Sequence, residues 1–126
     1  MEIKQDRLYT QEHEWLRQEG NRLYVGISDH AQEALGAIVF VELPAVGKVL
    51  PAGAAVAVVE SVKAASSVYT PVGGTVLEVN SRLEEQPELL NETPYDAWMV
   101  CLEAPSAFPD GLMDASAYEA FLAVEG

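Results

Sequence analysis

The amino-acid sequence predicts a mainly β fold, a sandwich or barrel of short antiparallel strands. Short runs that alternate apolar and polar residues, or are wholly apolar, recur along the chain. Clusters of glycine, proline and asparagine separate these runs every ten or so residues, which is typical of all-β domains. No low-complexity linker or strong repeat interrupts the pattern, so we expect one domain over residues 1–126.

The expected strands follow one another closely. Residues 14–17 and 22–27 flank the turn-forming segment 18–21, which predicts a β-hairpin. Pro44 ends a later strand, and residues 44–53 contain two turn-forming clusters. The full set of expected strands is 8–10, 14–17, 22–27, 37–43, 54–60, 65–70, 75–79 and 97–102, and 48–50 is a short run between the two turn clusters.

Three short helices are expected among the strands. Ser28 is a predicted N-cap, because its hydroxyl can accept a hydrogen bond from a first-turn N–H, and Gly36 is typical of a helix end. Residues 84–90 are a second expected helix. Residues 116–124 are the third, with an apolar face made by Tyr118, Phe121 and Leu122.

The chain is strongly acidic. It has 20 Asp and Glu residues against seven Lys and Arg, a formal net charge of −13, and Arg82 is the only base after residue 63. Such a surface repels nucleic acid and anionic membranes, so neither is an expected partner. The acids suit docking to basic patches on proteins, or they serve solubility alone, and composition does not separate these two roles.

The sequence contains nothing like a membrane span or a signal peptide. Glu2 and Asp6 are acids where a mitochondrial transit peptide would avoid them. We therefore expect a cytoplasmic, monomeric protein, with a mature protein of the mitochondrial matrix as the alternative location. Cys101 is the single cysteine, so no internal disulfide can form.

The most informative segment is residues 60–64, which separates two apolar runs. The pattern predicts a hairpin whose tip exposes Lys63, because burying an unpaired ammonium costs several kcal/mol. An exposed amine on a rigid hairpin suits attachment of a prosthetic arm, which can then visit several active sites. Spacing alone leaves two interpretations open, a carrier lysine and an ordinary solvated lysine.

Residues Glu60-Ser61-Val62-Lys63-Ala64 resemble the lipoylation motif of the H protein of the glycine cleavage system. Other segments match this family in order, so the resemblance covers residues 9–122 and implies a lipoyl-carrier domain with a core of about 9–122. These segments are 9–15, 25–32, 35–44, 71–74, 79–80, 89–91 and 94–95.

This resemblance implies a barrel-sandwich hybrid, two antiparallel sheets with a lipoyl-lysine hairpin. Lipoate would be joined to the Lys63 side chain by a lipoate-attaching enzyme, and the neighbours that form the attachment motif would be Glu60, Ser61, Val62 and Ala64. The implied protein is a carrier and not an enzyme, so neither catalytic residues nor a metal site is expected.

The resemblance also implies three enzyme partners. Glycine decarboxylase, a pyridoxal-phosphate enzyme, would load the aminomethyl group of glycine onto the lipoyl arm. A tetrahydrofolate-dependent aminomethyltransferase would then remove it, and dihydrolipoyl dehydrogenase would reoxidise the arm. Glu14 matches an acidic position of the cleft in which the family shelters its loaded arm.

Two departures from the family pattern affect that cleft. Ser67 stands four residues after the lysine, where the family usually has an acid, and residues 95–98 form a loop one residue shorter than usual. A relay that hands lipoate to 2-oxoacid dehydrogenases needs no such shelter, so Ser67 favours this alternative. A biotin carrier is disfavoured, because Val62 and Ala64 stand where biotin carriers have methionine. A plain, non-lipoylated interaction module also remains open.

The remaining reactive residue types have simpler interpretations. His13 and His30 are expected in surface or capping positions, because no second histidine completes a helical zinc motif at His13. Cys101 falls in an expected strand, which predicts a buried thiol. The acids at 84–85 and 110–114 do not have the spacing of a calcium loop.

Overall fold

Alternating apolar side chains along the strands produce two sheets that share one core. The computed structural model describes residues 1–125. Its strands are β1 (Leu8–Tyr9), β2 (Glu14–Glu19), β3 (Arg22–Ile27), β4 (Ile38–Glu42), β5 (Val49–Leu50), β6 (Ala55–Ser61), β7 (Ala65–Tyr69), β8 (Gly74–Val79) and β9 (Val100–Glu103). Its helices are α1 (Asp29–Leu35), α2 (Arg82–Glu85), α3 (Leu89–Glu92) and α4 (Ala115–Glu125).

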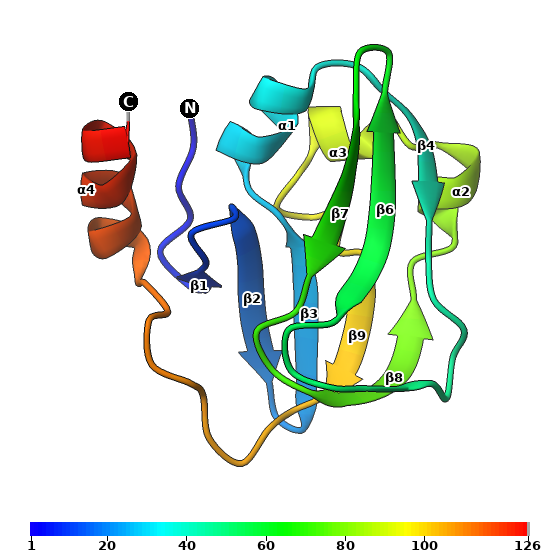
Figure 1. Cartoon of the computed structure of the whole chain (residues 1–126), viewed down its shortest axis with the longest axis vertical. Coiled ribbons are helices and arrows are strands. Elements are labelled where there is room, and N and C mark those ends of the chain that lie inside the picture. Colours follow the sequence, from blue (N-terminus) through cyan, green and yellow to red (C-terminus); the bar gives the residue numbers. More distant parts are fainter. Residues whose placement is uncertain (126) are drawn as a thin grey trace.

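The strands pair antiparallel throughout. A six-stranded sheet has the order β1-β2-β3-β9-β8-β5, and a three-stranded sheet has the order β4-β6-β7. Figure 1 shows the β6–β7 hairpin extending past the rest of its sheet, toward the end of the molecule where α1 and α3 lie. The predicted β2–β3 hairpin turns at Gly20, whose φ of 58° suits a side chain without a Cβ.

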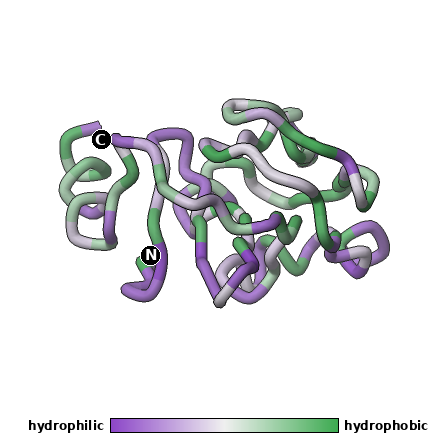
Figure 2. Tube along the Cα trace, turned by 90° about the horizontal axis from the view of Figure 1, so that it is seen from below, coloured by the Kyte–Doolittle hydropathy of each residue, from purple (hydrophilic) through white to green (hydrophobic). Residues whose placement is uncertain are grey.

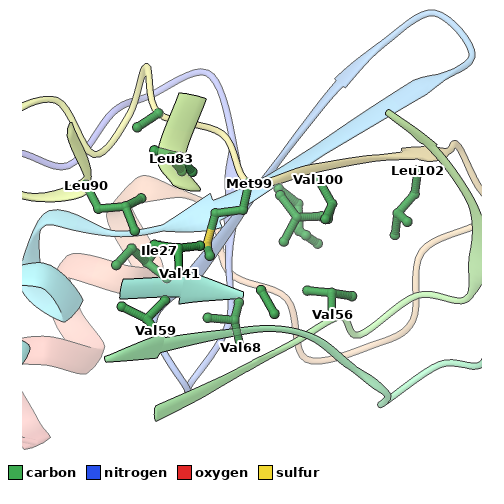
Figure 3. Packing of buried hydrophobic residues seen from close by; sticks show 14 of the residues in the cluster. Ile27, Val41, Val56, Val59, Val68, Leu83, Leu90, Met99, Val100 and Leu102 are labelled. Atoms are coloured by element: carbon green, nitrogen blue, oxygen red, sulfur yellow. The ribbon is translucent and has the colours of Figure 1, made fainter. Parts of the chain in front are cut away.

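The main core lies between the two sheets. In Figure 3, Val41, Val59 and Val68 of the smaller sheet face Met99 and Val100 on the other side. Leu83 and Leu90, which are fully buried, bring α2 and α3 onto the same core. Figure 2 shows the corresponding hydropathy along the chain, with hydrophilic stretches at the N-terminal segment and at several outer loops.

A second apolar cluster attaches α4 to the larger sheet. The rings of Tyr9 and Tyr118 stack in parallel with centroids 4.4 Å apart, and both side chains are fully buried. Trp15 belongs to the same cluster and donates its indole N–H to the carbonyl of Pro94, 3.0 Å away. The predicted apolar face of the C-terminal helix is confirmed, because Phe121 also packs here.

Most expected elements are confirmed, and two differ. The expected helix over 84–90 is two helices, α2 and α3, because Pro87 lacks the N–H that would continue one helix between them. The expected strand over 97–102 begins only at Val100, since the carbonyl of Trp98 accepts from the side chain of Asn80 instead of from a strand. Within residues 1–125, no helix combines the length and apolar character needed to cross a membrane.

Candidate functional site

The hairpin between β6 and β7 is closed by a serine. Glu60 pairs with Ala65, and the backbone N–H of Ser61 donates to the carbonyl of Ala64 at 2.7 Å. The Ser61 hydroxyl accepts from the backbone N–H groups of Lys63 and Ala64, at 3.4 and 3.2 Å. Serine can replace backbone partners in a tight turn in this way, so Ser61 fixes the shape of the tip.

Lys63 lies at the exposed tip of this hairpin, as the sequence predicts. Val62 beside it is 73% exposed, although it is apolar, and Ala64 is exposed as well. Among residues 1–125, no carboxylate lies within ion-pair distance of the Lys63 amine. The amine is therefore open to an enzyme that would acylate it.

The hairpin tip rests on the connection between α1 and β4. The backbone N–H of Val62 donates to the carbonyl of Ala37 at 3.0 Å. Gly36 ends α1 with a φ of 81°, and a Cβ on it would lie 3.6 Å from Cε of Lys63. The lysine stem therefore leaves the hairpin alongside the last turn of α1.

Asn91 of α3 holds that connection in place. Its side-chain oxygen accepts from the backbone N–H of Ile38 at 2.9 Å. Its amide nitrogen donates to the carbonyl of Gly36 at 2.9 Å and to the side chain of Gln32 at 3.0 Å. The Asn91 side chain thus joins the end of α1 to the start of β4. Its two backbone partners here, Gly36 and Ile38, flank Ala37, whose carbonyl accepts the hydrogen bond from Val62.

A cleft of about 190 Å³ opens between α1 and β7. Leu35 lines it and is followed by Gly36, where an added Cβ would lie 3.6 Å from Cε of Lys63, so this end of the cleft lies near the lysine stem. Its lining residues are Glu12, His13, Glu14, Ile27, Ala31, Ala34, Leu35, Ser66, Ser67 and Val68. The structure therefore brings Glu14 and Ser67, both expected at an arm cleft, to one surface.

Glu14 is a buried acid that lines this cleft, with 3% of its surface exposed, and it also lines a neighbouring cavity of about 530 Å³. Oε1 accepts from the Thr10 hydroxyl at 2.6 Å, and Oε2 accepts from the backbone N–H of Tyr69 at 3.0 Å. Burial raises the pKa of the Glu14 carboxyl, and these two hydrogen bonds partly offset the rise. Each carboxylate oxygen retains a lone pair for a further donor.

Ser67 differs from Glu14 in being exposed. It lies on β7 opposite Val58, and its hydroxyl makes no hydrogen bond to the residues that the structure describes. It therefore offers the cleft a free neutral hydroxyl and no charge.

The two histidines are not in the surface or capping positions expected from the sequence. Both are half-buried, and their rings lie 4.3 Å apart. His13 contacts Glu125 and Tyr118, which the sequence could not place beside it. Burial and the neighbouring His30 lower the pKa of His13. Cys101, by contrast, is buried in β9 as predicted.

Two antiparallel sheets with an exposed lysine on a braced hairpin are the architecture of a carrier domain, in which lysine holds a prosthetic group. Comparison with known proteins agrees with this class. The family model described as "Glycine cleavage H-protein" matches residues 7–125. The chain belongs to the glycine cleavage H-protein family, which fits the lipoyl-carrier role that the motif implies.

Relatives from several bacteria share about half of their residues with this chain. A glycine cleavage system H protein of Thermus thermophilus is 50% identical over 127 residues, covering 99% of both chains. The glycine cleavage system H protein 2 of Pseudomonas putida is 55% identical over 116 residues, covering 90% of this chain and 91% of the relative.

A solved structure confirms the fold. The crystal structure of a glycine cleavage system H protein from Mycobacterium marinum superposes with a TM-score of 0.88 at 37% identity, covering 96% of this chain and 99% of that one. The expected mainly β architecture, with two antiparallel sheets and a C-terminal helix, is thus confirmed.

We expect Asn91→Ala to loosen the hairpin tip. The change leaves the N–H of Ile38 and the carbonyl of Gly36 without their partner, at a cost of about 1–3 kcal/mol in the free energy of unfolding. Native-state hydrogen exchange should show selectively faster exchange at the Val62 amide. Asn80→Ala, which removes a side-chain hydrogen bond away from the hairpin, is the control and should not affect Val62 selectively. Equal effects of both variants on Val62 would contradict the bracing role.

The raised pKa of Glu14 gives a pH dependence with a defined sign. The folded protein keeps the Glu14 proton at pH values where the unfolded chain has released it, so protonation of Glu14 stabilises the folded state. This contribution to the free energy of unfolding is complete below the ordinary pKa of 4.5 and is lost as pH rises through the folded-state pKa. The unfolding free energy of the wild type minus that of Glu14→Gln should therefore fall as pH rises from about 4.5 to 7. A difference that stays flat over this pH range would contradict the raised pKa of Glu14.

Proposed function

We propose that this protein is the lipoyl-bearing carrier of a glycine cleavage system, with lipoate joined through an amide to Lys63. The observation that carries this proposal is the exposed Lys63 amine at a hairpin tip that is fixed by Ser61 and seated on Ala37. Family membership supports it. When bound, lipoate supplies a reactive disulfide at the end of a long tether.

The chain's own residues position that tether. The backbone bonds of Ser61 and Val62 hold the tip still, so movement begins at the Lys63 side chain. The cleft beside the lysine stem begins at Leu35 and is lined in part by apolar side chains, including Ile27 and Val68. It offers a resting place for an aliphatic arm.

Glu14 is the group in this cleft that suits the charge of a loaded arm. We propose that the arm carries the aminomethyl group of glycine from the pyridoxal-phosphate decarboxylase to the tetrahydrofolate-dependent aminomethyltransferase. The protonated amine of that group would donate a charge-assisted hydrogen bond to a Glu14 oxygen. Ser67 would add only a neutral hydroxyl.

The partner enzymes do the chemistry in this proposal, and the carrier catalyses no step. Dihydrolipoyl dehydrogenase would reoxidise the arm, and a lipoate-attaching enzyme would modify Lys63. The net charge of −13 suits docking to basic surfaces of these enzymes, chiefly by speeding encounter. The cytoplasmic location and monomeric state expected from the sequence stay predictions.

A second candidate function is a relay that passes lipoate to 2-oxoacid dehydrogenases. The observation that favours it is the free, neutral Ser67 in the cleft, since a relay has no amine to shelter. Glu14, buried beside the same cleft, favours the glycine-cleavage role. A non-lipoylated interaction module is the remaining alternative, and it predicts an unmodified Lys63.

Lys63→Arg should abolish lipoylation and leave the fold intact. Arginine keeps the positive charge, but its guanidinium is not acylated as an amine would be. Intact-mass measurement after treatment with a lipoate-attaching enzyme should show one lipoyl group on the wild type and none on this variant. Lys48→Arg, at another exposed lysine, is the matched control and should still accept lipoate. A lipoyl adduct on the Lys63→Arg variant would disprove the attachment site.

Ser67→Asp should lengthen the lifetime of the loaded carrier. A charge contact at an exposed position is worth about 1 kcal/mol or less, which corresponds to roughly fivefold at most, since 1.4 kcal/mol is tenfold. Glu14→Gln should shorten the lifetime. The measurement is ammonia or formaldehyde release from purified loaded carrier without the transferase.

Ser116→Asp adds the same charge on α4, away from the cleft, and should leave that rate unchanged. If neither cleft variant changes the release rate while Lys63 is still lipoylated, the relay role becomes the better account.

A further inference from the structure

Three potential metal ligands from distant parts of the chain converge at one end of the molecule. His13 comes from the loop before β2, His30 from the first turn of α1 and Glu125 from the last turn of α4. One donor atom from each lies within 4.8 Å of the other two. Figure 1 shows the C-terminal end of α4 at the same end of the molecule as α1, with β2 starting below α1.

The His13 ring is already oriented as a metal-ligating imidazole would be. Nδ1 forms a hydrogen bond with the Tyr118 hydroxyl at 2.8 Å, and that hydroxyl is 2.8 Å from the hydroxyl of Ser28. Nε2 is left facing Oε1 of Glu125 at 3.1 Å. A hydrogen bond to the second ring nitrogen is the usual way in which proteins orient a ligating histidine.

The His13 backbone is also unusual. Its φ of 72° is the only positive value at a non-glycine residue among those described. Such a conformation persists only where the surroundings hold it, and it is concentrated at functional sites. Here the carbonyl of His13 accepts from the N–H of Ser28 at 2.9 Å, which holds the loop in this shape.

His30 supplies a second, independent observation. Its Nδ1 atom is shielded from solvent and has no hydrogen-bond partner, and it is the only such buried side-chain nitrogen or oxygen in residues 1–125. Buried polar atoms without a partner are rare in folded proteins, and a bound ion is one of the features that account for them. A bound ion with its coordinated water would supply the partner that this ring lacks.

We propose that His13, His30 and Glu125 bind one divalent transition-metal ion, with Zn²⁺ as the best match. Two imidazoles and one carboxylate suit Zn²⁺, whereas Mg²⁺ and Ca²⁺ prefer oxygen ligands throughout. Ligands about 2.0–2.1 Å from a tetrahedral zinc lie roughly 3.3 Å from one another. The 3.1 Å between His13 and Glu125 already fits this spacing, and rotation of side chains closes the rest.

The proposed ion would have two effects on the protein. With three protein ligands, the fourth position stays open to water or to a small donor molecule. The ligands come from three segments, so the ion would bind the folded chain alone and stabilise it in proportion to its concentration. It would also fasten the last turn of α4 to α1.

The test is titration of the full chain with Zn²⁺ or Co²⁺, with the arm oxidised or absent so that no free dithiol competes. We expect one ion per chain by calorimetry, a d–d spectrum of low coordination number with Co²⁺, and a higher midpoint of thermal unfolding. His30→Phe keeps an aromatic ring and removes the unpartnered nitrogen, so it should fold normally and lose metal binding. Glu125→Gln should bind at least tenfold more weakly.

Glu119→Gln is the matched control, because it removes another exposed acid from α4 and should bind as the wild type does. Competition with excess Mg²⁺ distinguishes binding at this site from non-specific binding to the acidic surface, since Mg²⁺ should not displace an ion held by two histidines. The proposal is overturned by any of three results: binding without a stoichiometry of one, displacement by Mg²⁺, or wild-type affinity in both His30→Phe and Glu125→Gln.

Discussion

The site depends on one backbone hydrogen bond, from the N–H of Val62 to the carbonyl of Ala37. A two-stranded hairpin that projects from its sheet has few contacts of its own and would move freely at the tip. This bond attaches the tip to the end of α1, and Asn91 in turn fixes the segment that provides the carbonyl. Ser61 therefore sets the local shape of the tip, and the helices before and after the hairpin in sequence hold that tip against the rest of the protein.

The two charged residues of the proposed site, Lys63 and Glu14, differ in exposure. Lys63 is exposed and unpaired among the described residues, whereas Glu14 is buried with both oxygens hydrogen-bonded. A buried carboxylate that is held by two donors keeps its position, so its remaining lone pairs are aimed before any ligand arrives. A flexible acid at the exposed position of Ser67 would first lose side-chain entropy. The cleft thus holds one acid, Glu14, in a fixed position, beside the exposed side chain of Glu12.

Local features of this fold could be predicted from the sequence, and long-range ones could not. The hairpin lysine, the Ser28 cap and the end of α1 at Gly36 each follow from residues within a few positions of one another, and all three are found. The three hydrogen bonds of Asn91 join segments more than 50 residues apart, which no periodicity reports. The contact between His13 and Glu125 could not be predicted either, because these residues are far apart in sequence. The break at Pro87 had a local signal, the missing N–H, that outweighs the helical pattern around it.

The buried position of Cys101 matters for a protein whose proposed arm alternates between a disulfide and a dithiol. Thiol–disulfide exchange needs a thiolate that can reach the sulfur it attacks. The Cys101 side chain has no exposed surface, and it lies in β9 between β3 and β8. The chain therefore carries no accessible thiol that could capture the arm as a mixed disulfide. The fold would in this way keep the protein's own thiol out of the redox chemistry of the proposed arm.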